Sequence, residues 1–160
     1  ILKKVIDSLL ELETDLNKIN IDCFSSNKNI AIKQNKSKTP RIFFYKIFTS
    51  KKYFKKLIDS DLAIGAAGTA LFERLYMGVP SIVITMSENQ VDNALNLSKT
   101  KNIIYLGNHL NFNKSRLKNT LSTLIKNPKK FYYLQKKTFQ ISKSISSCSI
   151  IERIDQILAE

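Results

Sequence analysis

The chain has 160 residues, 43% of them hydrophobic, with 26 basic against 13 acidic side chains and a formal net charge of +13. This length and apolar content suit one compact domain with a buried core and leave no room for a second domain of ordinary size. No apolar run approaches the roughly 18 residues of a membrane span, and no signal segment opens the chain, so we expect a cytoplasmic protein.

The metal-binding residue types are scarce. The cysteines are Cys23 and Cys148, the single histidine is His109, and none has a metal-type spacing to another. We therefore predict no metal site and no cofactor. Inert thiols are the expected state of both cysteines, and a cytoplasmic setting argues against a disulfide between them. His109 follows a predicted strand and is expected to be a loop or surface residue.

The first 60 residues alternate between helical and extended patterns. A helical apolar face begins at Leu2 and predicts the first helix. The expected elements are a helix over 1–14, a strand over 21–24, an interrupted helical stretch from Asn27, a strand over 41–47 and a helix over 51–59.

The stretch from Asp61 to Gln90 carries most of the functional information. Asp61 to Ile64 predicts a short buried parallel strand. In the turn Gly65-Ala66-Ala67-Gly68, both glycines allow positive φ and leave room for a ligand's phosphates to reach backbone N–H groups. The helix starting near Thr69 directs its free N–H groups and positive dipole end at the same place. Together the turn and the helix start predict an anion site.

Further polar residues follow this turn. Glu73 lies about one helical turn on, where a carboxylate suits the two hydroxyls of a ribose. Arg74 is expected to point about 100° away and to pair at the surface. Gly78-Val79-Pro80 ends the helix, Ser81 to Ile84 is the next strand, and Ser87 to Gln90 has the spacing of a capping box that opens a third helix.

Two helix starts thus lie at the carboxyl ends of neighbouring parallel strands, where open α/β sheets bind ligands. Strand-turn-helix units also occur in proteins that bind no nucleotide there. On the residues alone, a purely structural turn remains the alternative.

The rest of the chain continues the alternation. One helix carries Leu117, Leu121, Leu124 and Ile125 on a single face, and Asn127-Pro128 ends it. The expected elements are helices over 89–100, from Asn113, over 129–144 and over 150–159, and a strand over 102–106. This order predicts a single Rossmann-like domain over residues 1–160, a three-layer α/β fold with a parallel sheet and right-handed crossovers.

The order of motifs in the central stretch resembles a known family. Gly65 to Gly68, Glu73-Arg74, Gly78-Val79-Pro80 and Glu88-Asn89-Gln90 match the pattern of the carboxyl-terminal domain of the PseG family, the UDP-sugar hydrolases of pseudaminic acid biosynthesis, and of SpsG-like polysaccharide-biosynthesis proteins. More distantly, the stretch is similar to the UDP-binding half of MurG-type glycosyltransferases, which have the two-domain GT-B fold.

This resemblance implies the carboxyl-terminal half of a GT-B fold, which binds the UDP of a UDP-sugar. Backbone amides from Ala66 to Thr69 would hold the diphosphate and Glu73 the ribose. Glu88, Asn89 and Gln90 would lie toward the second phosphate or the sugar hydroxyls, and uracil would lie near the strand over 41–47. A UDP-sugar hydrolase is the activity implied first. A glycosyltransferase is the alternative, because it would share this site and differ only in the acceptor.

The resemblance also bears on what the chain contains. In the family a strand and a glycine-rich loop precede the first helix, whereas this chain enters that helix at Ile1. We therefore expect a fragment that lacks the amino-terminal domain, where the unidentified catalytic residues would lie, and that catalyses nothing alone.

The positive charge suggests a rival function. Lys33 to Lys56 holds nine basic residues and Lys99 to Lys143 eleven, with no acidic residue in either segment, as in nucleic-acid-binding proteins. Lysines on solvated helix faces explain this as well, and base recognition favours arginine, so no nucleic-acid partner is expected. Lys129 to Leu134 is compatible with a peripheral membrane contact. A core-packing aromatic cluster is the favoured interpretation of that segment.

Overall fold

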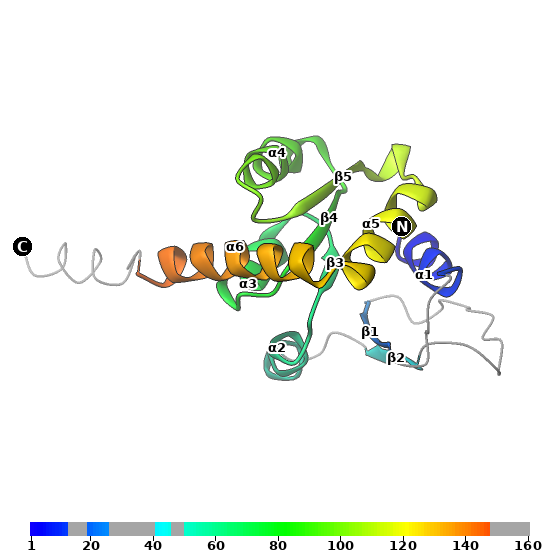
Figure 1. The fold of residues 1–160 in the computed structure, drawn as a ribbon, viewed down its shortest axis with the longest axis horizontal. Coiled ribbons are helices and arrows are strands. Elements are labelled where there is room, and N and C mark those ends of the chain that lie inside the picture. The colour runs from blue at the N-terminus through cyan, green and yellow to red at the C-terminus, as the bar shows by residue number, and fades with distance from the viewer. Residues whose placement is uncertain (13–18, 26–40, 46–49, 148–160) are drawn as a thin grey trace, which may run out of the picture.

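The computed structural model describes residues 1–12, 19–25, 41–45 and 50–147, and Figure 1 shows their arrangement. The helices are α1 (Leu2–Leu10), α2 (Ser50–Ile58), α3 (Thr69–Tyr76), α4 (Val91–Lys99), α5 (Lys114–Lys126) and α6 (Pro128–Ser147), with short 3-10 turns η2 (Glu88–Gln90) and η3 (His109–Asn111). The strands are β1 (Asn20–Phe24), β2 (Arg41–Tyr45), β3 (Ala63–Gly65), β4 (Ser81–Thr85) and β5 (Ile104–Asn108). The interrupted helical stretch from Asn27 and the helix over 150–159 lie outside the described residues.

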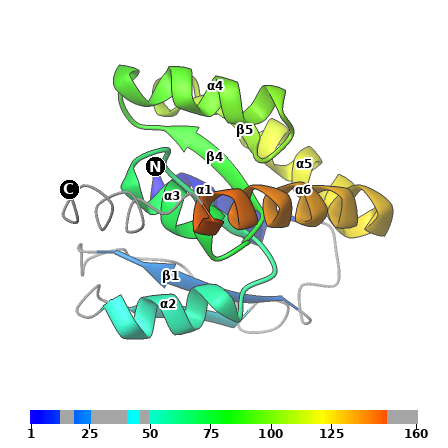
Figure 2. The ribbon, with the colours of Figure 1, turned by 90° about the vertical axis from the view of Figure 1, so that its left-hand side faces the viewer.

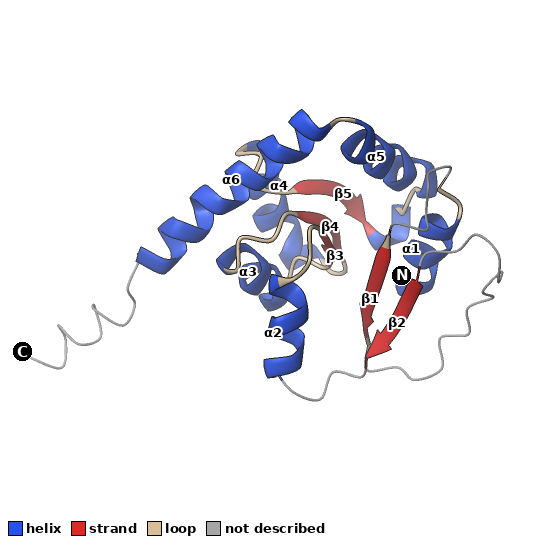
Figure 3. Ribbon diagram, turned by 60° about the horizontal axis from the view of Figure 1, so that its bottom comes forward, coloured by secondary structure: helices blue, strands red, loops and turns tan. Residues whose placement is uncertain are grey.

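All strand pairs of the described residues run parallel, as predicted, but these strands form two sheets rather than one (Figure 3). One sheet holds β1 and β2, paired in register from Asn20 against Arg41 to Phe24 against Tyr45. The other has the order β3-β4-β5, so β4 is its centre. Alternating helices and strands predict the direction of the strands correctly, because a crossover helix requires parallel neighbours. The pattern does not say which strands become neighbours.

The larger sheet has a hydrophobic core on each face, because successive side chains of β4 point to opposite sides. Ile82 and Ile84 pack with α1, α5 and the start of α6. Val83 packs on the other side, with α3 and α4. The result is the predicted three-layer arrangement, which can be followed in Figure 2.

Helix ends agree well with the turn signals of the sequence. Gly78 has φ +71°, and the backbone N–H groups of Gly78 and Val79 close a Schellman turn onto Leu75 and Arg74. The Asn113 side chain accepts a hydrogen bond from Arg116 N at 3.0 Å and caps α5.

Three predicted details are wrong. The strand expected over 102–106 begins two residues later, because Lys101 and Asn102 still belong to a second Schellman turn that ends α4. Ile125, predicted on the buried face of α5, is 46% exposed, whereas Leu117, Leu121 and Leu124 are buried. The first helix also ends at Leu10 rather than at residue 14.

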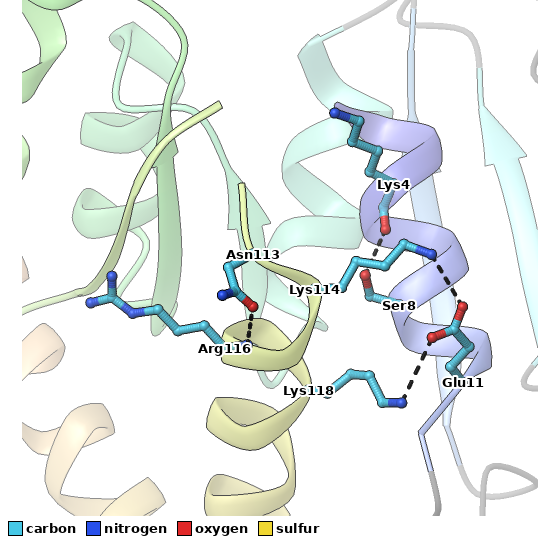
Figure 4. A network of polar contacts seen from close by, with 7 residues as sticks. All are labelled: Lys4, Ser8, Glu11, Asn113, Lys114, Arg116 and Lys118. Atoms are coloured by element: carbon cyan, nitrogen blue, oxygen red, sulfur yellow. Dashed lines mark hydrogen bonds and ion pairs between the residues drawn. The ribbon is translucent and has the colours of Figure 1, made fainter. Parts of the chain in front are cut away.

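Ion pairs and hydrogen bonds join the outer elements. Glu11, just after α1, pairs with Lys114 at 3.1 Å and Lys118 at 3.7 Å on α5 (Figure 4). The hydrogen bond from Lys114 and the two positive charges lower the pKa of Glu11. On the outer edge of β5, Arg116 donates to the carbonyls of Tyr105 and Leu106. The Arg116 side chain therefore covers this part of the edge strand.

Candidate functional site

The predicted anion site lies where β3 ends and α3 begins. Gly65 is the last residue of β3, Gly68 is the N-cap of α3, and Thr69 is the first residue of that helix. A glycine N-cap has no side chain, so no side chain caps the first turn of α3. The helix therefore presents backbone N–H groups and its positive dipole end at the carboxyl edge of the sheet.

The two glycines of this turn are favoured for different structural reasons, and neither of them has a positive φ. The glycines with positive φ in the described ranges are Gly78 and Gly107. A Cβ on Gly65 would lie 2.8 Å from Arg74 Nη1, so the space beside Gly65 is already filled. A Cβ on Gly68 would meet Gln90 Nε2 at 3.5 Å, an ordinary contact distance. Close approach of a ligand to the backbone is therefore possible at Gly68 and blocked on that side of Gly65.

Arg74 is buried, and the prediction of a surface pair is wrong. Its side chain is 5% exposed and reaches back under the turn, where one guanidinium nitrogen donates to the Ala66 carbonyl at 2.6 Å. Nε donates to the Ser81 hydroxyl at 3.3 Å. Burial lowers the pKa of Arg74, but an arginine remains a cation in the protein. The sequence supplied the pair Glu73-Arg74 but not the inward direction of the arginine.

Tyr53 is a second neighbour of the turn that the sequence did not single out. It lies near enough to Arg74 for the two charges to influence each other's pKa, and its ring packs edge-on against Phe24, with 5.3 Å between the ring centres. Burial raises the pKa of Tyr53. Tyr53 thus connects α2 and β1 to the residues beneath the glycine turn. In the sequence Tyr53 stands between pairs of lysines, and nothing there marks it for this position.

Gln90 lies beside the turn, although not through the predicted capping box. In that motif the Ser87 hydroxyl would cap the helix, but it donates instead to Asn89 Oδ1 at 2.5 Å. Gln90 Oε1 accepts from Met86 N at 2.9 Å, one residue earlier than the motif requires. This bond holds the Gln90 amide nitrogen toward Gly68. The difference arises because the chain first forms the 3-10 turn η2 and only then α4.

The remaining predicted residues occupy the same edge with varying exposure. Glu73 is half-buried, one turn into α3, and its charge acts on Tyr53. Glu88 and Asn89 are exposed in η2, directly after β4. The structure therefore brings the turn from Gly65 to Thr69 together with Gln90. Among the described residues, no hydrogen bond or ion pair joins Glu88 or Asn89 to that turn.

His109 was expected to be a loop or surface residue, and Cys23 a buried or inert thiol. His109 opens η3 at the end of β5 and is half-buried, with its Nδ1 buried and lacking a hydrogen-bond partner among the described residues. Cys23 is a buried free thiol whose pKa is raised to about 11 by burial. It therefore stays protonated at neutral pH. Cys148 lies outside the described residues. Within the described ranges, no three His, Cys, Asp or Glu side chains gather as a metal site.

A groove of about 940 Å³ lies elsewhere, between α5, α6 and the start of β5. Ile103, Leu124 and Leu134 are among its apolar lining residues, and Lys101, Lys129 and Lys130 contribute cations. None of the nine predicted site residues lines it.

The aromatic segment at the start of α6 was predicted to pack into the core. The structure shows that only part of it does. Leu134 is buried, but Tyr132 is 67% exposed and Tyr133 46% exposed. Further along α6, Phe139 is 56% exposed. In the described part of the chain, no helix combines the length and apolar character needed to cross a bilayer.

Similarity to solved structures shows the fold. The spinosyn rhamnosyltransferase SpnG matches with a TM-score of 0.75 at 16% identity, over 99% of this chain and 40% of its own. SpnG complexed with thymidine diphosphate gives a TM-score of 0.73 at 15% identity, over 99% of this chain and 40% of its own. The spinosyn forosaminyltransferase SpnP gives a TM-score of 0.70 at 15% identity, over 99% of this chain and 38% of its own. This chain thus spans about 40% of the length of these proteins, and its fold is that of the carboxyl-terminal half of GT-B glycosyltransferases.

No curated protein matches the chain. A family model does match, over residues 6–152: the glycosyltransferase family 28 C-terminal domain. Because this match covers most of the chain, the protein belongs to the family of glycosyltransferase family 28 C-terminal domains.

Proposed function

We propose that this domain binds the nucleoside diphosphate of a nucleotide-sugar and belongs to a glycosyltransferase. One observation carries the proposal. The start of α3 at Gly68 has no side-chain cap, and the Gln90 side-chain amide lies beside it, at the carboxyl ends of β3 and β4. Backbone N–H groups, a helix dipole and an amide donor together suit a diphosphate. Membership of a glycosyltransferase family supports transfer of the sugar to an acceptor over its hydrolysis by an enzyme of the PseG type.

Individual roles follow from position. Amides from Ala66 to Thr69 would hold the diphosphate, and Glu73 the ribose hydroxyls. Gln90, with Glu88 and Asn89, would face the sugar-side phosphate or the sugar. UDP is the nucleotide we propose. Thymidine diphosphate, named in the SpnG complex, is the closest chemical alternative because it is also a pyrimidine nucleoside diphosphate.

The rest of the enzyme lies, in this proposal, in a second domain that completes the site. The similar transferases are about two and a half times as long as this chain, which spans 40% of SpnG. Catalytic groups and the acceptor site would come from that second domain. Products of the full-length enzyme decide between the two activities: a glycoside formed on an acceptor supports a transferase, and free sugar released into water supports the hydrolase.

Calorimetric titration of the full-length protein with UDP, thymidine diphosphate, CMP and a short single-stranded oligonucleotide tests the binding function. We expect saturable UDP binding, weakened about tenfold in Glu73→Gln because the ribose loses a charged hydrogen-bond acceptor. Asp92→Asn is the matched control, since it removes an equal charge from an exposed position in the first turn of α4. Its affinity should equal that of the wild type.

Two outcomes contradict the proposal. Equal loss of affinity in both variants would mean that Glu73 acts only through overall charge. Salt-dependent oligonucleotide binding without UDP binding would support the rival nucleic-acid function.

The outward face of α6 supports a second, separate role as a contact for an anionic membrane surface. This helix contains five lysines and no acidic residue, and Tyr132, Tyr133 and Phe139 are exposed on it. Lys101 and Lys137 lie about 6 Å from the Tyr133 ring centre, at 5.7 Å and 5.9 Å. Lysines beside exposed aromatic rings suit the interface of a bilayer that carries anionic lipids.

A further inference from the structure

We propose that Arg74 is a positioning residue: bonded to the Ala66 carbonyl and the Ser81 hydroxyl, it fixes the glycine turn in the conformation that binds a nucleoside diphosphate, without touching the ligand. The ligand in this statement rests on the function proposed above. The positioning itself follows from geometry alone. It is separate from the roles that the sequence motif suggests, which concern the turn and Glu73.

Arg74 joins three elements that meet beneath the turn. It comes from the last turn of α3, donates to the Ala66 carbonyl at 2.6 Å between β3 and α3, and donates to the Ser81 hydroxyl at 3.3 Å at the start of β4. Ser81 in turn donates to the Val79 carbonyl at 3.1 Å. Because Ser81 is fully buried and Arg74 nearly so, these bonds have no competing water in the interior.

The bond to Ala66 determines where the next amide points. The peptide between Ala66 and Ala67 is trans, so its C=O and N–H groups point in opposite directions. Since the C=O points at the buried guanidinium, the Ala67 N–H points away from it. Ala67 is one of the amides assigned to the diphosphate. Arg74 therefore orients a binding group through the opposite side of the same peptide, and it adds a positive charge directly behind the turn.

Gly65 is the residue that makes room for this arrangement. A Cβ there would lie 2.8 Å from Nη1 and 3.2 Å from Cζ of Arg74. The guanidinium cannot move aside freely, because its bonds to Ala66 and Ser81 hold it. The first glycine of the turn is thus required by Arg74 rather than by the ligand. Gly65 and Arg74 should consequently behave as a coupled pair.

Tyr53 of α2 lies close enough to Arg74 for each to influence the pKa of the other, and its ring packs against Phe24 of β1. Tyr53→Phe keeps this ring packing and removes only the hydroxyl near the guanidinium.

A double-mutant cycle on the full-length protein tests the positioning. Thermal unfolding is measured for the wild type, Gly65→Ala, Arg74→Ala and the double variant. We expect Gly65→Ala to lower the unfolding midpoint by about 5 °C in the wild-type background, where the new methyl meets the guanidinium. In the Arg74→Ala background the same methyl should have less than half that effect, since the space is then empty. Equal effects in both backgrounds would overturn the coupling.

Nucleotide affinity is the second measurement. UDP affinity should fall about tenfold or more in Arg74→Ala and in Arg74→Lys, because lysine keeps the charge but cannot hold two partners in the guanidinium geometry. Tyr53→Phe should give a smaller loss. In the enzyme assay, KM for the donor should rise while kcat at saturating donor is unchanged, since Arg74 does not touch the reacting atoms. Millimolar guanidinium should restore affinity to Arg74→Ala, and equal methylammonium should not.

Several results would overturn the proposal. Folded Arg74→Lys with wild-type UDP affinity would do so, and so would a fall in kcat with KM unchanged. If Arg74→Ala does not fold, the cycle is completed with Arg74→Lys. Lysine has no guanidinium, so the space beside Gly65 is then vacated. If the wild type binds no nucleoside diphosphate, the proposed function is wrong and the ligand part of this inference falls with it. The unfolding cycle still decides whether Arg74 fixes the turn.

Discussion

At the scale of single residues, the two glycines of the turn show that residues of one motif can have different structural roles. Gly65 and Gly68 have the same apparent purpose in the sequence, yet one makes room for Arg74 and the other lies open beside Gln90. The sequence identifies the turn because glycines at the end of an apolar run are visible without a structure. It cannot show Arg74 turning inward, because an arginine after a glutamate on a helix is usually solvated.

The difference leads to a prediction for Gly68→Ala. Gly68 has φ −82° and its added methyl meets only Gln90 Nε2 at 3.5 Å, so the unfolding midpoint should change by less than about 2 °C. UDP affinity should nevertheless fall about tenfold, because the methyl occupies the space through which phosphates reach the backbone. Differential scanning calorimetry and UDP titration of the same preparation measure both effects. Unchanged affinity would remove Gly68 from the binding site.

At the scale of elements, the prediction succeeded where the signal was local. The ends of α3 and α5 follow from Gly78 and Asn113, whose backbone conformation and side-chain chemistry end or start a helix by themselves. The capping box at Ser87 was wrong because another local hydrogen bond, from Ser87 to Asn89, competed with it. The division into two sheets could not be predicted, since it depends on contacts between distant strands.

The exposed face of α6 gives the prediction that belongs to this scale. In a sedimentation assay with phosphatidylglycerol vesicles, the full-length protein should bind at low salt, and phosphatidylcholine vesicles should retain little of it. Changing Lys129, Lys130 and Lys136 to glutamine should weaken the binding on the order of 100-fold, about 1 kcal/mol for each charge.

The control for α6 removes the same charge elsewhere. Lys3, Lys4 and Lys99 are exposed on α1 and α4, and their change to glutamine should leave most of the vesicle binding intact. Equal weakening by both triple variants would show that only net charge matters. Binding to both lipids alike would exclude an electrostatic contact at α6.

At the scale of the whole molecule, the positive charge and the predicted site are separate. Residues 99–143 carry eleven basic side chains and no acidic one, which leaves a net +2 of the total +13 for the rest of the chain. The stretch 61–92, which contains the turn, has four acidic residues and one basic residue, Arg74. Within this stretch, attraction of a diphosphate to the turn must therefore come from backbone N–H groups, the α3 dipole and Arg74.

Two places thus compete for an anionic ligand: the glycine turn and the basic groove between α5 and α6. The groove has the volume of a typical ligand pocket, about 940 Å³. The turn is the site we propose, because its donors point at one place and a second domain would close over it. Sequence motifs indicated the turn, whereas the groove has no motif, since its lining comes from four separate segments.

The most direct test of the central claim is a backbone-amide NMR titration of the isotopically labelled protein with UDP. We expect the largest shift changes at the amides from Ala66 to Thr69 and at the Gln90 side-chain amide. Changes confined to the groove around Lys101, Lys129 and Lys130, with the turn unmoved, would contradict it.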